Sequence, residues 1–222
     1  MSKFEFDKVS PGWHYDQFAP PENELEHIGS IDEIAHPDIT DNTLDVVNNI
    51  LSDPYDEGGI KRVHIGDPAE DVNSSTINKR VAHMREVGYT KDNYFIEFIN
   101  EKFPLLEKIL SDQYNITHYH YCAIMINPGQ CMPVHDDTYS YLKKYMSRDY
   151  PDVKYSMSDI RRYCTFLTDW EWGQSFGAGN VIKWQWKKGD VFQWSHKMLH
   201  WSSNASMKPM LFYEITGLTN EW

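Results

Sequence analysis

The pattern of hydrophobic and polar positions changes near residue 115 of the 222-residue chain. Before that point, apolar residues recur at helical spacing, as in Leu44, Val47, Ile50 and Leu51. Such spacing is typical of amphipathic helices that pack on another surface. After it, the apolar runs are short, aromatic and β-branched, and glycine and proline separate them, which is typical of strands and turns. The pattern therefore predicts a helical first half and a β-rich second half.

The first half divides into two predicted segments. Residues 1–40 are rich in proline and charged residues and are interpreted as an irregular arm, and residues 41–114 as supporting helices. Apolar stripes predict helices near residues 44–51 and 77–84 and, around Phe98, a third that Pro104 breaks or restarts. Residues 60–66 are predicted to form one short strand. These elements carry no evident chemistry and are expected to act as scaffold.

The second half, residues 115–222, is predicted to be the core of a single domain. Its strand-like runs are Ile116–Ile126, Arg162–Thr168, Asn180–Trp186, Asp190–Trp194 and Lys208–Thr216. No helices alternate with these runs, so a parallel sheet is not expected, and an antiparallel sandwich or barrel-like roll fits better. The polar, tyrosine-rich residues 139–158 are expected to form a loop or short helix over the mouth of the roll.

Composition excludes several classes of function. The net charge of −12 disfavours a general nucleic-acid binder, which is usually basic. No apolar run approaches the roughly 20 residues of a membrane span, and the first residues lack the pattern of a signal peptide. Three cysteines without a CxxC spacing are typical of a reducing compartment. A cytoplasmic protein without nucleic-acid or membrane partners is therefore expected.

The strongest chemical signal is His135-x-Asp137, which follows a Pro-Gly turn. Residues two apart on a strand face the same way, with Cα atoms roughly 6–7 Å apart, so both side chains can reach one metal ion. They supply two of the three ligands of the two-His-one-carboxylate facial triad that holds Fe(II). The third ligand must come from a distant strand. His196 and His200 are both candidates, and His200 is preferred because it is expected to open a strand, whereas His196 lies in the preceding turn.

Two other interpretations of the second half of the chain stay open. His118-x-His120 is the short pattern that begins a cupin-type metal site, although no glutamate follows at the expected spacing. A jelly-roll module that binds a protein or carbohydrate without catalysis is the other. Metal-dependent activity without an organic co-substrate would favour the cupin-type site. Absence of iron affinity would favour the non-catalytic module.

The ordered motifs resemble the 2-oxoglutarate/Fe(II)-dependent oxygenases, and within them the prolyl-hydroxylase-related branch, including small phage-encoded members. The matching pieces are Asn127-Pro128-Gly129 before His135-x-Asp137, then Arg162–Leu167, Lys188–Trp194, His200, and Asn204-Ala205 leading to Ile215–Gly217. The resemblance covers roughly residues 119–218. It implies a double-stranded β-helix, a jelly roll with supporting N-terminal helices. It also implies a dioxygenase that hydroxylates its substrate, with cytoplasmic location in a host cell if the chain is phage-encoded.

The resemblance further implies the residues of the site. Fe(II) would be held by His135, Asp137 and His200, and 2-oxoglutarate would chelate it. The far carboxylate of 2-oxoglutarate meets a basic residue in this family, for which Lys208 is the first choice and Arg162 the alternative. The position that usually carries this residue aligns with Met210, so Lys208 departs from the pattern. Hydroxyl or amide partners for 2-oxoglutarate are expected from Asn127, Tyr121 or Thr165.

The substrate is the least determined part of the prediction. The expected partners are O₂ and a small molecule or peptide, with a prolyl residue as the family default. Four aromatic residues are expected to flank the mouth of the site: Tyr139, Tyr141, Trp170 and Trp172.

Overall fold

The computed structural model describes residues 25–32, 61–63, 96–99 and 104–219, with the exception of residues 136, 138 and 197. The helices expected near residues 44–51 and 77–84 lie outside the described residues, as does most of the predicted arm. Among the described residues, no helix has the length and apolar character needed to cross a membrane.

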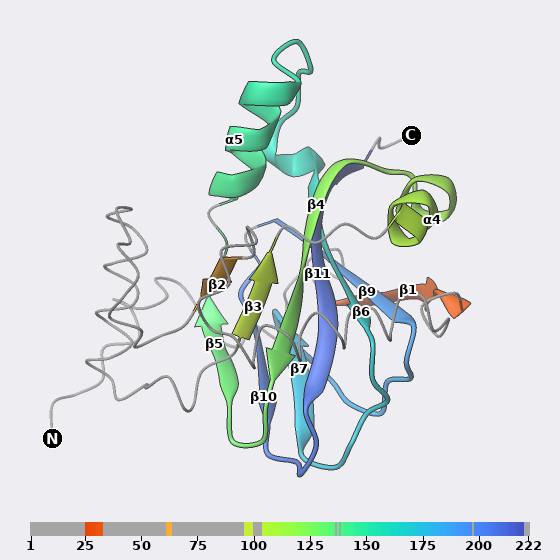
Figure 1. Ribbon diagram of the computed structural model, residues 1–222, viewed down its shortest axis with the longest axis vertical. Coiled ribbons are helices and arrows are strands. Elements are labelled where there is room, and N and C mark those ends of the chain that lie inside the picture. Colours follow the sequence, from red (N-terminus) through yellow and green to blue (C-terminus); the bar gives the residue numbers. More distant parts are fainter. Residues whose placement is uncertain are drawn as a thin grey trace, which may run out of the picture.

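Eight consecutive strands of the second half form two facing antiparallel sheets (Figure 1). The strands are β4 (Ile116–Ile126), β5 (Cys131–His135), β6 (Ile160–Phe166), β7 (Gln174–Ala178), β8 (Val181–Lys183), β9 (Asp190–Ser195), β10 (His200–Asn204) and β11 (Met210–Thr219). The smaller sheet has the order β5-β10-β7-β8, and the centre of the larger sheet has the order β9-β6-β11-β4. The chain passes repeatedly from one sheet to the other, which is the topology of a double-stranded β-helix. The fold class predicted from the sequence is confirmed.

Three strands from the first half extend the larger sheet at its edges. β1 (Glu26–Ser30) pairs with β9, and β3 (Ile96–Ile99) lies between β4 and β2 (Lys61–Val63). The helix predicted around Phe98 is therefore wrong, and the predicted arm contributes a strand at β1. Four residues are too few to distinguish the period of a helix from that of a strand, and here pairing with the edge of β4 produces a strand. The strand predicted over residues 60–66 is confirmed at β2.

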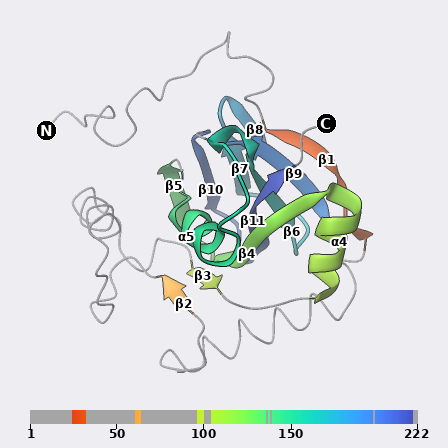
Figure 2. The same ribbon diagram turned by 90° about the horizontal axis from the view of Figure 1, so that it is seen from above.

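Two α-helices of the described residues pack on the roll, as Figure 2 shows from above. Helix α4 (Pro104–Tyr114) begins at the proline, whose missing N–H is tolerated in the first turn. Its Ile109 and Leu110 are buried against the outer face of the larger sheet. Helix α5 (Ser140–Asp149) packs Leu142 and Met146 onto the ends of β6 and β11. Residues 139–158 were expected to form a loop or short helix, and the structure has a helix there.

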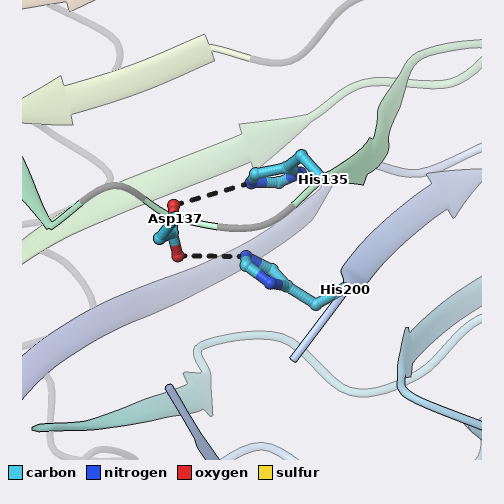
Figure 3. A group of neighbouring side chains, drawn as sticks. All are labelled: His135, Asp137 and His200. Carbon is cyan, nitrogen blue, oxygen red and sulfur yellow. Dashed lines mark ion pairs between the residues drawn. The ribbon is translucent and has the colours of Figure 1, made fainter. Parts of the chain in front are cut away.

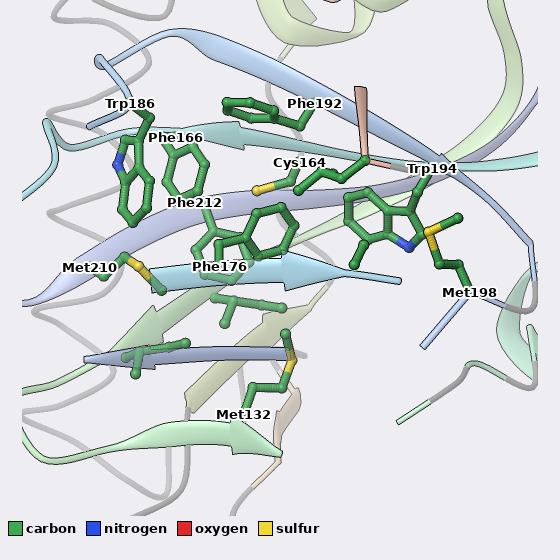
Figure 4. Close-up of a cluster of buried hydrophobic side chains, with 14 of the residues drawn as sticks. Met132, Cys164, Phe166, Phe176, Trp186, Phe192, Trp194, Met198, Met210 and Phe212 are labelled. Atoms are coloured by element: carbon green, nitrogen blue, oxygen red, sulfur yellow. The ribbon is translucent and has the colours of Figure 1, made fainter. Parts of the chain in front are cut away.

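An aromatic core fills the space between the sheets (Figure 4). Phe166 is fully buried and stacks on Trp186 with ring centroids 4.0 Å apart, and it also contacts Phe176 and Phe212. Strand β11 shows how one strand serves both faces of its sheet. Met210 and Phe212 point into this core, whereas the alternate residues pack outward against the cluster that includes α4. The inward set continues with two buried polar residues, Glu214 and Thr216, which marks the end of the roll that carries the candidate site.

Candidate metal centre

Three side chains with metal-binding atoms meet between β5 and β10 (Figure 3). His135 ends β5 and His200 begins β10, and the two are direct partners in the antiparallel register. Asp137 follows β5 and faces both imidazoles from one side, with its Oδ1 3.8 Å from His135 Nε2 and its Oδ2 3.4 Å from His200 Nε2. One ligand atom from each residue lies within 4.8 Å of the others. The structure thus brings together the three residues predicted as metal ligands.

The hydrogen bonding of His200 prepares it to be a ligand. Its Nδ1 lies 3.1 Å from the carbonyl oxygen of Met198, which can only accept, so Nδ1 carries a hydrogen and Nε2 is the nitrogen left to bind a metal ion. The ring is fully buried, and Nε2 has no hydrogen-bond partner in the described part of the chain. Instead it faces Asp137 Oδ2 at 3.4 Å and Glu214 Oε1 at 3.5 Å. A metal ion bound to Nε2 would also lie close to both carboxylates.

The donor set fits a divalent transition metal. Two imidazole nitrogens and one carboxylate on one side are the ligands of the non-haem Fe(II) facial triad. Ligand atoms at right angles, each about 2.1 Å from an ion, lie about 3 Å apart. The separations from Asp137 to the two imidazole nitrogens are 3.4 and 3.8 Å, and no pair of ligand atoms is more than 4.8 Å apart, so the three side chains must move closer to one another to reach that arrangement.

A buried arginine links the triad to the larger sheet. Arg162 lies on β6 opposite Thr216 of β11, and its Nη2 is 2.9 Å from Asp137 Oδ2. The same nitrogen donates to Glu214 Oε1, and Nη1 donates to Thr216 Oγ1. Burial opposes the charged form, but Asp137 and Glu214 raise the pKa of the Arg162 guanidinium, so this side chain is a permanent cation beside the metal ligands.

Two N–H groups next to the triad are buried without a hydrogen-bond partner among the described residues. They are Nε of Arg162 and Nε1 of Trp194. Arg162 and Trp194 are directly opposite each other in the β6–β9 pairing, and the Trp194 ring lies 5.2 Å from the His200 ring. An unpaired buried donor costs about 1–3 kcal/mol. Arg162 Nε belongs to the side chain that pairs with Asp137, so an acceptor oxygen of a ligand bound beside the triad would satisfy it.

His120 completes the polar end of the roll. It lies on β4 opposite Thr216 of β11, inside the sheet that also carries Arg162. Burial, together with the positive charge of Arg162, lowers the pKa of His120 to about 4. The His120 imidazole is therefore neutral at ordinary pH. It adds no charge to the site, although it comes from the His118-x-His120 pattern that suggested a cupin-type centre.

Lys208, the first choice for the carboxylate anchor, lies away from the triad. Its side chain is 67% exposed and its Nζ pairs with Glu171 at the surface. The Lys208 carbonyl accepts from Asn204 Nδ2, and Asn204 in turn accepts from Gly129 N. This is the end of the roll where β4 joins β5, about 13 Å along β5 from His135. The expectation that Lys208 points inward to the site is not met, because the chain turns into β11 only at Met210.

The expected amide and hydroxyl partners are also elsewhere. Asn127 lies in the turn before β5, at the same distant end as Lys208. Tyr121 belongs to the outer cluster and contacts Tyr213 there, with ring centroids 5.6 Å apart. Thr165 also points to the outer face of its strand, and its hydroxyl donates to the carbonyl oxygen of Gly189. None of these three side chains reaches the triad in this structure.

The aromatic residues expected at the mouth divide between the two ends. Tyr139 is buried beside α5, near the site, whereas the side chain of Tyr141 lies outside the described residues. Trp170 and Trp172 precede β7, whose first residue pairs with Asn204 and whose last pairs with His200. These two tryptophans therefore lie at the end opposite the triad, and the expectation for them is wrong. A loop's position follows from strand register, which composition does not reveal.

Sequence reasoning missed Glu214 and Trp194 as site residues. A signal for Glu214 was present, because it is the one acidic residue in the apolar strand Met210–Thr219. A glutamate that is buried in its charged form is usually paired with a cation, such as arginine, lysine or a metal ion. Trp194 gave no comparable signal, since its place beside His200 depends on the pairing of β6 with β9.

Comparisons with known proteins found similarity only to solved structures. No protein-family model and no curated protein match this sequence. Similar solved structures include a Klebsiella pneumoniae protein described as an uncharacterized conserved protein with a double-stranded beta-helix domain, at 16% identity, TM-score 0.31, 47% of this chain and 72% of that one. A predicted oxalate decarboxylase from Thermotoga maritima is similar at 11% identity, TM-score 0.35, 56% of this chain and 80% of that one. KdgF from Halomonas sp. is similar at 8% identity and a TM-score of 0.34, and the match covers 57% of this chain and 81% of that one.

These low overall scores carry no argument about function. The class defined by the strand order is a double-stranded β-helix protein. Within this class, the His135, Asp137 and His200 cluster makes the protein a candidate metalloprotein.

Proposed function

We propose that the protein is an Fe(II)-dependent dioxygenase that uses 2-oxoglutarate and O₂ to hydroxylate a small molecule or peptide, with a prolyl residue as one candidate. The observation that carries the proposal is the triad of His135, Asp137 and His200. The first two stand at the end of the second core strand and the third at the start of the seventh, paired across the smaller sheet. Bound there, Fe(II) and 2-oxoglutarate would supply the oxidising chemistry, and the protein would supply the ligands and exclude water.

The anion-binding part of the proposal rests on Arg162. This side chain is 8% exposed, charged, and adjacent to Asp137, as a carboxylate-binding group beside the metal must be. Its Nε is buried and has no hydrogen-bond partner among the described residues, and the same holds for Nε1 of Trp194, which lies opposite Arg162 in the β6–β9 pairing. A carboxylate of 2-oxoglutarate would satisfy both. Arg162, the alternative anchor of the sequence prediction, is therefore preferred over Lys208.

A metalloenzyme that does not use 2-oxoglutarate is the second candidate. The observation in its favour is that the Arg162 guanidinium already pairs with two carboxylates, Asp137 and Glu214. An incoming carboxylate therefore finds only the Nε edge of Arg162 open. The two candidates differ in whether 2-oxoglutarate is consumed.

The decisive experiment is formation of succinate from 2-oxoglutarate by the purified protein with added Fe(II) and ascorbate. We expect slow uncoupled turnover without substrate, and faster turnover when a candidate peptide or small molecule occupies the site. Asp137→Ala serves as the control for free iron in solution, since it loses the anionic ligand. Succinate formation equal in the wild-type protein and in Asp137→Ala would reject the proposed activity.

The anchor assignment makes a separate prediction. Arg162→Gln removes the charge but keeps a hydrogen-bond donor, and we expect the apparent KM for 2-oxoglutarate to rise at least about tenfold, since a buried carboxylate loses its cation. Lys208→Ala should leave that KM unchanged, because Lys208 pairs with Glu171 at the surface. The measurement is a 2-oxoglutarate titration of both variants side by side. If the KM for 2-oxoglutarate rises in Lys208→Ala and not in Arg162→Gln, Lys208 is the residue that binds the far carboxylate.

A further inference from the structure

Glu214 is a second carboxylate beside the triad, and no motif in the sequence accounts for it. Its side chain is 6% exposed, and its Oε1 accepts from Arg162 Nη2. The same oxygen lies 3.5 Å from His200 Nε2, as close as Asp137 Oδ2 at 3.4 Å. Arg162 Nη2 thus bridges Asp137 and Glu214, and both carboxylates face the one ligand nitrogen that has no hydrogen-bond partner among the described residues. Glu214 therefore belongs to the electrostatic environment of the metal.

The positive charge of Arg162 opposes metal binding, and the negative charge of Glu214 offsets it. A guanidinium next to a metal ligand repels a divalent cation, and the repulsion is strong because the site is buried. Asp137 alone would leave a pair of Arg162 and Asp137 with no net charge, so an incoming dication would create an uncompensated buried charge of +2. With Glu214 the three side chains carry −1, and the loaded centre carries +1. A net positive centre of that size still attracts an anionic co-substrate.

We propose that Glu214 is the counter-ion of Arg162 within the metal centre, and that it permits a permanent cation to stand beside a bound divalent metal. Glu214 acts here as a positioning and charge-balancing residue, and not as a member of the ligand triad. The pair leaves the Nε edge of Arg162 open for an anion, while its charge no longer opposes the metal. The inference rests on the metal centre of the proposed function, but it does not depend on 2-oxoglutarate being the co-substrate.

The proposal predicts that removing the charge of Glu214 lowers the metal affinity, whereas removing the charge of Arg162 does not. Glu214→Gln keeps the shape and an acceptor oxygen for Arg162 but removes the negative charge, so metal affinity should fall at least about tenfold. Arg162→Gln removes the repelling charge, so the metal should bind at least as tightly as in the wild type. The double variant should return to within about threefold of the wild-type affinity. A purely structural role predicts instead that both single variants and the double variant all bind the metal more weakly.

The experiment measures Co(II) binding by calorimetry and by the visible absorption of the bound ion, with no co-substrate present. Glu171→Gln removes a matching surface charge, and Arg161→Gln alters the neighbouring arginine of the same strand; both should bind Co(II) like the wild type. Melting of each variant in chelator reports whether it folds. If Glu214→Gln does not fold, Arg162→Gln still decides. Weaker binding by tenfold in Arg162→Gln, or unchanged binding in a folded Glu214→Gln, would overturn the proposal.

Failure of this inference is distinguishable from failure of the proposed function. If Co(II) binds and Glu214→Gln has no effect, the counter-ion role is wrong while the metal centre stands. If the wild-type protein binds no divalent metal, both fail together. If metal binding follows the predicted signs but 2-oxoglutarate is not consumed, the counter-ion role stands, and the second candidate function, a metalloenzyme that does not use 2-oxoglutarate, replaces the first.

Discussion

Loss of metal binding is the expected result of replacing His200 by alanine. His200 Nε2 is fully buried, carries the lone pair and faces the two carboxylates, so its removal takes away one of three ligands and leaves two. Changes to groups that merely orient a ligand cost 10- to 100-fold in metal affinity. Loss of the ligand itself should therefore exceed about 100-fold. His135→Ala and Asp137→Ala should have effects of the same size, because each removes one member of the same triad.

The measurement is direct titration with Fe(II) under anaerobic conditions, repeated with Co(II). His196→Ala is the matched control, since His196 lies four residues earlier in the turn before β10 and is not part of the triad. His200→Gln is a second variant that fills the buried site if alanine prevents folding. Full binding in His200→Ala together with loss in His196→Ala would show that the wrong histidine has been assigned.

The largest expected effect on stability is at Phe166. Its ring is fully buried between the two sheets, stacks on Trp186 at 4.0 Å, and meets Phe176, Phe192 and Phe212 edge-on or tilted. Truncation of a buried phenylalanine to alanine costs about 3–5 kcal/mol, through lost burial and the cavity left behind. Since whole domains are stable by about 5–15 kcal/mol, Phe166→Ala should remove a large part of the free energy of unfolding.

Urea denaturation followed by circular dichroism measures this effect. Trp172→Ala is the control, because the Trp172 side chain is 81% exposed and its truncation should change the free energy of unfolding by less than about 0.5 kcal/mol. A cost below about 1 kcal/mol for Phe166→Ala would mean that the two sheets do not pack through this ring.

The clustering of His135, Asp137 and His200 could be predicted because its signal is local. His135 and Asp137 are two residues apart on an extended segment, and this spacing alone places them on one side. His200 could be chosen over His196 from the expectation that it opens a strand, and β10 does begin at His200. The carboxylate anchor had no such local signal. Lys208 and Arg162 were both basic residues next to predicted strands, and nothing in their neighbourhoods separated them.

By itself, the sequence determined the β-rich second half, the bounds of β4 and the proximity of His135 to Asp137. Each depends on periodicity or spacing within about ten residues, where backbone geometry dictates which side chains share a face. Tertiary structure alone decided that Ile96–Ile99 is a strand, because the edge of β4 offers it hydrogen bonds. It also decided the partners of Arg162. Thr216, Trp194 and Glu214 lie 54, 32 and 52 residues away in the chain (216 − 162, 194 − 162 and 214 − 162), and only the register of β6 with β9 and β11 brings them together.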